Sequence, residues 1–266
     1  MLYLVCTPIG NLKDITLRAI EVLKSVSLIL AEDTRHSAIL CAEYGITAPM
    51  ISYQKFNEKS KCAEIAERLR AGEEIALITD AGTPCVSDPG GVLVQCLIEN
   101  GLPYTVVGSA CAFVSAAVLS GFPLQPLAFC GFLPEKGAAR TAYLNGLRSF
   151  GGSMAFYVSP HAFARDLESV FHAFGARRAV LVREISKKFE ECVRFTLGET
   201  PVFTEKGEYV LVIEGQPPEN ERNALSVREH VASYMAEGMP KKDAIKRAAA
   251  DRGVAKSEIY KETLDL

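Results

Sequence analysis

The stretch that decides the fold is ALITDAGTPCVSDPG, residues 76–90. Its first four residues form a short apolar run of the kind that is buried in a parallel sheet. The run stops at Asp80, and a loop rich in turn residues follows. Open α/β sheets bind ligands beyond the carboxyl ends of their strands, so this loop is a candidate ligand site. Gly82 permits close approach of a ligand to the backbone, Pro84 stiffens the turn, and Asp80 offers an acceptor. A plain strand-to-helix loop capped by Asp88 stays open as an alternative.

Three other apolar runs in the first half of the chain end in loops of similar composition. Runs at residues 2–6, 27–31 and 104–107 alternate with segments of helical periodicity. This alternation over about 120 residues predicts a parallel sheet covered on both faces. Its functional loops would meet at one edge, namely residues 7–11, 32–35, 80–84 and 108–110. The dinucleotide fingerprint GxGxxG is absent, which disfavours a conventional Rossmann domain.

The second half of the chain predicts a smaller α/β domain, with strands that need not all be parallel. Strands are expected at residues 127–130, 154–158 and 179–183, and a closing strand pair at 189–197 and 208–214. We therefore expect three parts: an N-terminal α/β domain at 1–120, a second α/β domain at 121–217 and a helical tail at 218–266.

The tail is locally basic. Its cationic residues are Lys241, Lys242, Lys246, Arg247, Arg252, Lys256 and Lys261. A solvated helix face explains such a pattern, and so does a module that contacts RNA phosphates. The sequence leaves both explanations open.

Composition excludes several classes of protein. The chain has 266 residues and a formal net charge of −3, so it lacks the overall basic footprint of a nucleic-acid-binding protein. This argues only weakly against nucleic acid, because a local basic patch stays open, and we expect no DNA partner. Its eight cysteines include no CxxC pair, which indicates a reducing cytosol. Four scattered histidines and no cluster with ligand spacing give no metal site to propose. Glycines and prolines break the longest apolar run, so we expect no membrane span and a cytoplasmic protein.

The predicted edge of the first sheet could hold a polar, partly cationic ligand. Asp80 and the backbone of residues 81–83 would contact it, with Glu32, Asp33 and Arg35 on the rim. A paired acid and base can position a substrate proton, although the same trio also makes an ordinary structural salt-bridge cluster. Lys136 and residues 183–184 would face the same cleft if the two domains close on it.

Six motifs together resemble one family. They are TPIGN (7–11), AEDTRH (31–36), DAGTPCVSDPG (80–90), GFLP (131–134), REISKKFEE (183–191) and GEYVLVIEG (207–215). The chain resembles the tetrapyrrole-methylase-like methyltransferases that depend on S-adenosylmethionine (SAM). Within them it is most similar to the branch that 2′-O-methylates a cytidine in the decoding region of 16S rRNA. The resemblance covers nearly the whole chain.

The resemblance implies that SAM binds between the two domains. It also implies a homodimer that acts on 16S rRNA, within the small ribosomal subunit. Carried onto this sequence, the cofactor-binding residues are Pro8, Ile9, Gly10, Asp80, Ala81, Gly82, Thr83, Pro84, Gly108, Ser109, Ala110 and Tyr157.

Transfer of a methyl group to a ribose 2′-oxygen needs fixed geometry, a dry cleft and a group that accepts the hydroxyl proton. Our hypothesis assigns that proton to Asp33 or Glu32, and assigns RNA phosphates to Arg35 and Lys136.

The sequence departs from the family pattern at several positions. Ser109 replaces a proline, Phe56 a histidine and Val158 a glutamate, and basic residues are sparse at 137–139. These changes bear on the grip on the substrate more than on the cofactor loops. Two other functions remain as alternatives: a SAM methylase of a tetrapyrrole or other small molecule, and a non-enzymatic protein that binds RNA or the ribosome.

Overall fold

The computed structural model describes residues 1–215, 221–252, 254–264 and 266. The chain forms two compact units. The first contains residues 1–148 and 152–215 and holds two β-sheets, and the second holds the C-terminal helices. Among the described residues, no helix is both long and apolar enough to cross a bilayer.

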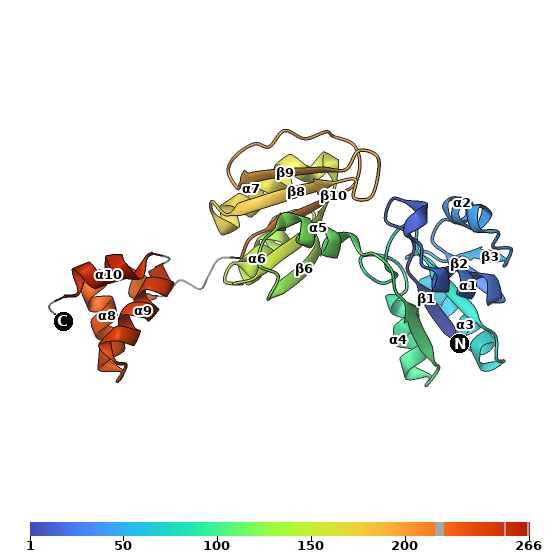
Figure 1. Ribbon diagram of the computed structural model, residues 1–266. Helices are drawn as coiled ribbons and strands as arrows, with labels where there is room; N and C mark the ends of the chain where they lie inside the picture. The colour runs from blue at the N-terminus through green and yellow to red at the C-terminus, as the bar shows by residue number, and fades with distance from the viewer. Residues whose placement is uncertain (216–220, 253, 265) are drawn as a thin grey trace. The chain divides into compact units, whose positions relative to one another are not determined.

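The first sheet has five strands in the order β3-β2-β4-β1-β5, and every pair is parallel. The prediction of a parallel sheet is confirmed. Its strands are β1 (Leu2–Val5), β2 (Leu28–Ala31), β3 (Met50–Ser52), β4 (Ile75–Ile78) and β5 (Tyr104–Val107) (Figure 1). All four residues of β2 and of β4 are buried, as expected for central strands covered on both faces.

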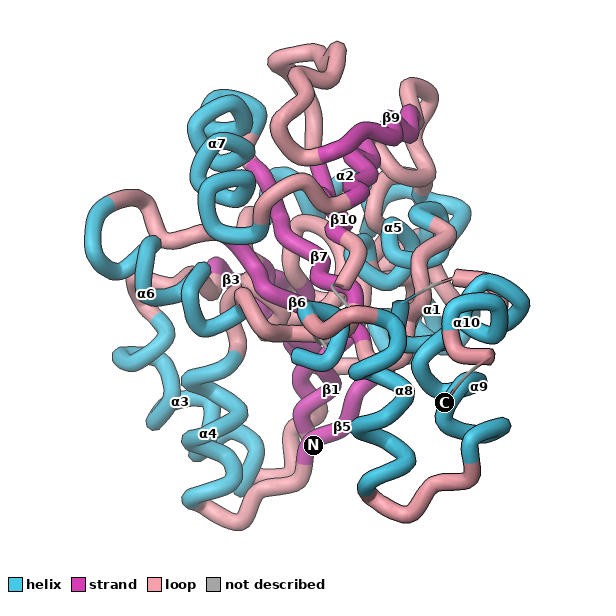
Figure 2. The backbone as a smooth tube through the Cα atoms, turned by 90° about the vertical axis from the view of Figure 1, so that its left-hand side faces the viewer, coloured by secondary structure: helices cyan, strands magenta, loops and turns pink. Residues whose placement is uncertain are grey.

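Helices cover both faces of this sheet. Helices α1 (Leu17–Ser25) and α2 (Thr34–Tyr44) share one apolar cluster with it. Helices α3 (Glu58–Arg70) and α4 (Gly91–Glu99) lie side by side and share the other (Figure 2). The chain therefore leaves β1 toward one face and leaves the adjacent β4 toward the other. Such a reversal opens a crevice at the carboxyl ends of the two strands.

The second sheet is mixed, with the order β6-β7-β10-β8-β9. Its strands are β6 (Leu127–Phe132), β7 (Ser153–Val158), β8 (Arg178–Arg183), β9 (Glu191–Thr196) and β10 (Tyr209–Ile213). Strands β6 and β7 are parallel, and the other pairs are antiparallel. The expected closing pair is wrong in one respect: β9 and β10 do not pair with each other, because β8 lies between them. The fully apolar β10 takes the central position instead.

Helix α5 (Ala112–Ser120) packs against the second sheet, although the predicted boundary after residue 120 assigned it to the first domain. Ala116 contacts an apolar cluster that includes Ala155, Val180 and Val210. Small side chains let the helix approach the sheet closely. On the same sheet, α6 (Gly137–Leu147) and α7 (Phe163–Phe174) are joined by a buried ion pair between Arg140 and Asp166, 2.8 Å apart.

The C-terminal unit contains α8 (Val227–Ala236), α9 (Lys241–Arg252) and α10 (Lys256–Glu262). A capping box between Ser226 and Glu229 begins α8. Two of the basic residues predicted on its surface make internal contacts. Arg252 Nε donates to the buried His230 Nδ1 at 3.0 Å, and Lys241 Nζ donates to the carbonyl of Leu264 at 3.2 Å.

Candidate functional site

The loops after β1 and β4 are bonded to each other. Thr7 N donates to the carbonyl of Gly82 at 2.9 Å, and Gly82 N donates to the carbonyl of Thr7 at 3.1 Å. The Thr7 hydroxyl also donates to the carbonyl of Thr79 at 3.1 Å. Gly82 has a φ of +84°, which a residue with a side chain rarely adopts. Gly82, which the sequence predicted to permit close approach of a ligand, is thus also favoured at this position by its backbone conformation.

The loop after β2 joins the same edge. Asp33 N donates to Asp80 Oδ1 at 3.2 Å, and Asp80 N donates to Glu32 Oε2 at 3.4 Å. Gln54, beyond β3, donates its side-chain amide to the carbonyl of Glu32 at 3.1 Å. The loops after β1, β2 and β4 thus meet at one edge of the first sheet, as the sequence predicted, and hydrogen bonds connect them there.

A cavity of about 460 Å³ opens at this edge, within the range of about 300–1,000 Å³ usual for small-molecule sites. Residues of both sheets line it. The first sheet with its loops and helices, here called the first lobe, contributes Ile9, Glu32, Asp80, Ala81, Gly82, Thr83, Val86, Ser87 and Asp88. From the region of the second sheet come Cys111, Ala112, Phe132, Tyr157, Val158, Ser159, Pro160, Ile185, Gly207, Glu208, Tyr209 and Val210.

Four carboxylates line this larger cavity: Glu32, Asp80, Asp88 and Glu208. Burial, together with the negative charges of Glu32, Asp80 and Glu208, raises the pKa of Asp88 to about 7 against the opposing effect of Lys55. Burial also raises the pKa of Glu32, although a hydrogen bond from the backbone of Asp80 opposes this. A site with this excess of partly desolvated negative charge favours a ligand that carries positive charge.

Asp88 does not cap the helix that follows it, so the alternative role left open for it is wrong. The residue before α4 is Gly90, with a φ of +127°. Its backbone N–H donates to the buried Glu58 Oε1 at 2.5 Å. The Asp88 carboxylate is therefore left facing the larger cavity.

The larger cavity suits the sulfonium cofactor that the sequence implies. Apolar side chains such as Ile9, Tyr157 and Val210 provide contacts for a flat, weakly polar group, and the carboxylates match a cation. Of the predicted cofactor residues, Ile9, Asp80, Ala81, Gly82, Thr83 and Tyr157 line this cavity. Pro8 and Gly10 line a smaller neighbouring cavity. Pro84, Gly108, Ser109 and Ala110 line neither, although Cys111 and Ala112 directly follow them into the larger one.

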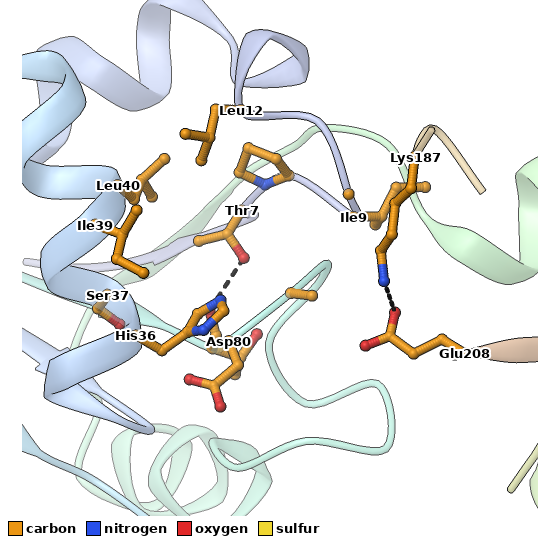
Figure 3. Close-up of a pocket in the computed structure, with 14 residues that line it drawn as sticks. Thr7, Ile9, Leu12, His36, Ser37, Ile39, Leu40, Asp80, Lys187 and Glu208 are labelled. Atoms are coloured by element: carbon orange, nitrogen blue, oxygen red, sulfur yellow. Dashed lines mark hydrogen bonds and ion pairs between the residues drawn. The ribbon is translucent and has the colours of Figure 1, made fainter. Parts of the chain in front are cut away.

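The smaller cavity measures about 250 Å³ and shares Ile9, Asp80 and Ala81 with the larger one. Figure 3 shows His36, Ser37, Ile39 and Leu40 of α2 on one side of it, with the Lys187–Glu208 pair on the other. Within the described structure, the buried Ser37 Oγ and Thr79 Oγ1 lack hydrogen-bond partners, and both residues line this cavity. Polar groups left unpaired in this way are available to a ligand or to water.

The REISKK loop of the second sheet docks on the first lobe. Glu184 and Ser186 both have positive φ, +50° and +67°, and the Ser186 hydroxyl donates to the carboxylate of Asp14. A Cβ at Gly10 would lie 2.5 Å from Lys187 Cγ and 2.7 Å from the carbonyl oxygen of Ile185. Only glycine therefore permits this approach. Left-handed backbone at non-glycine residues concentrates at functional sites.

Lys187 holds this loop to β10. Its Nζ lies 3.0 Å from Glu184 Oε1 and 3.0 Å from Glu208 Oε2. Burial disfavours the charged amine, but hydrogen bonds to Glu184 and Glu208 outweigh it and raise the pKa of Lys187. The lysine thereby neutralises part of the acidic lining.

Asp33, Arg35 and Lys136 line neither cavity. Asp33 caps α2 by accepting from Arg35 N, and it forms a 2.7 Å ion pair with the Arg35 guanidinium. That hydrogen-bonded pair lowers the pKa of Asp33 strongly, which makes its carboxylate a weak base. Lys136 is exposed at the start of α6. Their catalytic roles remain predictions, whereas Glu32 does lie in the larger cavity.

Sequence reasoning missed Asp88 as a site residue, and it missed Ile185 and Glu208 on the facing lobe. Asp88 lies inside the stretch quoted first, where its position between Ser87 and Pro89 made it look like a turn residue. Ile185 and Glu208 belong to the quoted motifs REISKKFEE and GEYVLVIEG. Their place in these motifs, which lie in the second half of the chain, was the signal that could have marked them as site residues.

Comparison with known proteins accounts for these motifs. The profile of the tetrapyrrole (corrin/porphyrin) methylases matches residues 1–201. Ribosomal RNA small subunit methyltransferase I of Bacillus subtilis (strain 168) is 39% identical over 98% of this chain and 92% of the relative. The protein of the same name from Escherichia coli O157:H7 is 37% identical over 99% of this chain and 94% of the relative. The chain belongs to the tetrapyrrole methylase family.

Solved structures show the same fold at low sequence identity. Uroporphyrin-III-C-methyltransferase of Thermus thermophilus superposes with a TM-score of 0.59 at 18% identity, covering 80% of this chain and 93% of that one. Diphthine synthase superposes with a TM-score of 0.61 at 12% identity, covering 80% and 89%. A further structure of the Thermus enzyme, complexed with S-adenyl homocysteine, has a TM-score of 0.56 at 19% identity and covers 80% and 96%. The predicted fold class, two α/β sheet domains of this type with a helical tail, is confirmed.

Proposed function

We propose that this protein is a SAM-dependent methyltransferase that methylates the ribose 2′-oxygen of a cytidine in the decoding region of 16S rRNA. The observation that carries the proposal is identity of 37–39% over almost the whole chain with relatives named for the small-subunit ribosomal RNA. The tetrapyrrole enzymes match at 17–19% identity, which supports the fold and not their substrates.

SAM supplies an activated methyl group on a positively charged sulfur. Asp80, the backbone of residues 81–83, Ile9 and Tyr157 would hold it, because they line the larger cavity. The acidic lining would stabilise its charge, and closure of the cavity by both lobes would exclude water. Pro8, Gly10, Pro84 and residues 108–110 would shape this pocket from behind its lining.

We assign Asp88 as the acceptor of the ribose hydroxyl proton, with Glu32 as the second candidate. The hydroxyl must lose its proton as its oxygen attacks, and a general base works best with a pKa near the operating pH. Asp88 meets that condition with a pKa of about 7 and faces the larger cavity. Asp33 fits less well, because Arg35 lowers its pKa. Arg35, whose side chain is 89% exposed, and Lys136 remain candidates for RNA phosphates.

The primary test is the modification state of rRNA. Deleting the gene should remove one 2′-O-methylcytidine from 16S rRNA, measured by nucleoside mass spectrometry, and the wild-type gene should restore it. Unchanged rRNA after deletion would contradict the proposal and favour a small-molecule substrate. Calorimetry with SAM tests the remaining alternative, a non-enzymatic protein that binds RNA or the ribosome, because such a protein would bind no cofactor.

We further propose that the protein is a cytoplasmic homodimer. Val106 on the edge strand β5 is 48% exposed, and Val114 and Val118, one turn apart on α5, are 45% and 64% exposed. Apolar side chains of this kind are buried when a partner covers them. Val118→Lys should convert the sedimenting species from dimer to monomer, whereas Val202→Lys, at an 88% exposed position elsewhere, should not. A wild-type monomer would contradict this part.

A further inference from the structure

One phenyl ring beside the larger cavity lies wholly in solvent. Phe56 is 100% exposed, and it lies in the loop between β3 and α3, beyond the carboxyl edge of the first sheet. Phenylalanine gains more than most side chains by leaving water. Two further features mark the position: the hydrogen bonds that hold its loop and the residues that surround it.

A closed turn presents this ring. Gln54 N donates to Asn57 Oδ1 at 2.8 Å, and Asn57 N donates back to the carbonyl of Gln54 at 2.9 Å. The Asn57 side-chain amide also donates to the carbonyl of Ser52, the last residue of β3, at 3.3 Å. Phe56 lies inside this turn, so these hydrogen bonds fix the position of its backbone at the surface. A backbone held in advance loses little freedom when its side chain binds a partner.

The same turn is attached to the lining of the larger cavity. The Lys55 ammonium donates to the carbonyl of Ser87 at 2.8 Å, and the Gln54 amide donates to the carbonyl of Glu32 at 3.1 Å. Both Ser87 and Glu32 line the larger cavity. The turn therefore places an aromatic ring and a positive charge at consecutive positions next to the candidate methyl-transfer site.

A second exposed ring comes from the facing sheet. Phe132, at the end of β6, is 58% exposed and lines the larger cavity. Its neighbour Gly131 has a φ of +60°, and a Cβ there would lie 3.7 Å from Ser87 Oγ. The Phe132 ring lies 5.5 Å from that of Tyr157. Lys55 and Gly131, the residues that precede Phe56 and Phe132, thus both lie near Ser87.

We propose that Phe56 and Phe132 form a stacking surface for an unpaired RNA base beside the nucleotide whose ribose is methylated. The inference rests on the proposed function and names how that substrate is gripped. Proteins that read single-stranded RNA stack its bases on aromatic rings and place cations against its phosphates. The two rings and Lys55 provide both elements on segments that approach Ser87. An RNA segment with a splayed base is the occupant that fits.

The test uses the full-length protein and small ribosomal subunits from the deletion strain. Phe56→Ala should raise the KM for the subunits by roughly 5- to 150-fold, the range that loss of one stacked base implies. Phe56→Leu keeps an apolar side chain without a flat face and should be nearly as impaired. Phe56→Tyr keeps the face and should stay within about threefold of the wild type. In all three variants the affinity for SAM, measured by calorimetry, should be unchanged.

Phe189→Ala is the matched control. Phe189 is 63% exposed, has the Lys188 ammonium 5.7 Å from its ring centre, and lines neither cavity. It is therefore another exposed phenyl ring beside a lysine, and its removal should leave the KM within about threefold. Phe132→Ala should raise the KM for the subunits without lowering the affinity for SAM. Weaker SAM binding would instead make Phe132 part of the cofactor site and overturn its assignment.

Several outcomes would overturn the inference. An unchanged KM for Phe56→Ala would remove this ring from RNA binding, and full activity of Phe56→Leu would exclude stacking. A change in sedimentation for Phe56→Ala would place the ring between two copies of the chain instead. Failure of the proposed function looks different, because the wild-type protein itself would then not methylate the subunits.

Discussion

The loops that follow β2 and β4 start from neighbouring strands, and both carry aspartates, yet those aspartates differ in their chemistry. Asp33 is partly exposed and paired with Arg35, which lowers the pKa of Asp33 strongly. Asp88 faces the larger cavity, where burial and three carboxylates raise its pKa to about 7. The comparison teaches that the surroundings, and not the residue type or the sheet edge, decide which carboxylate can act as a base.

The two loops are also held differently. Asp33 accepts a hydrogen bond from Arg35 N, two residues away, at 2.9 Å. The turn around Asp88 depends on Glu58 of another helix, which accepts from Gly90 N at 2.5 Å. That turn also contains Cys85 and Ser87 at φ of +71° and +69°. Tertiary contacts maintain this strained turn, whereas the other is a local cap.

The largest effect is expected when Asp88 is replaced by asparagine, with the same substitution at Asp33 as the comparison. Asp88→Asn should lower kcat by about 100- to 10,000-fold at saturating SAM, because positioned general bases contribute that much. Asp33→Asn should keep turnover, since asparagine also caps a helix. Methylation of subunits in single-turnover assays checks both variants. The reverse result would restore Asp33 as the proton acceptor.

The dependence of the rate on pH distinguishes the same two residues. Only an ionised carboxylate can accept the proton, and Asp88, with a pKa of about 7, becomes protonated as the pH falls through 7. The rate of the chemical step should therefore fall about tenfold per pH unit below 7 and level off above it. If Asp33 were the base, its lowered pKa would leave the rate flat between about pH 6 and 8. Single-turnover rates across that interval decide between them.

Glu58→Ala tests how the Asp88 turn is held. It would leave the buried Gly90 N–H without its acceptor, which costs about 1–3 kcal/mol of unfolding free energy. Glu58→Gln is the control, because its side-chain oxygen can still accept the bond. Urea denaturation measures both. Equal midpoints for Glu58→Ala and the wild type would show that the turn does not depend on this bond.

The smallest effect is expected at the local cap. Asp33→Ala should lower the urea midpoint less than Glu58→Ala does, because the freed N–H groups at an exposed helix start can bind water. Its kcat and its affinity for SAM should equal those of the wild type. A loss of turnover here, with SAM still bound, would contradict the distinction drawn between the two loops.

Much of the fold could be read from local patterns. The strands expected at 104–107 and 179–183 appear as Tyr104–Val107 and Arg178–Arg183, because an apolar run between turn residues is a local signal. Strand partners are not local. The sequence therefore misplaced β9 beside β10, and it gave no sign that α5 packs on the second sheet, since any apolar strand or helix face can pack on either sheet.

By itself, the sequence determined the parallel sheet, the loops gathered at its carboxyl edge, and the family to which its motifs belong. Only the tertiary structure decided which of those loop residues face the larger cavity. It placed the half-buried Asp88 among other carboxylates, paired Asp33 with Arg35, and brought Ile185 and Glu208 across from the second sheet. The physical reason is that a carboxyl group's pKa depends on burial and on charges that are close in space but distant along the chain.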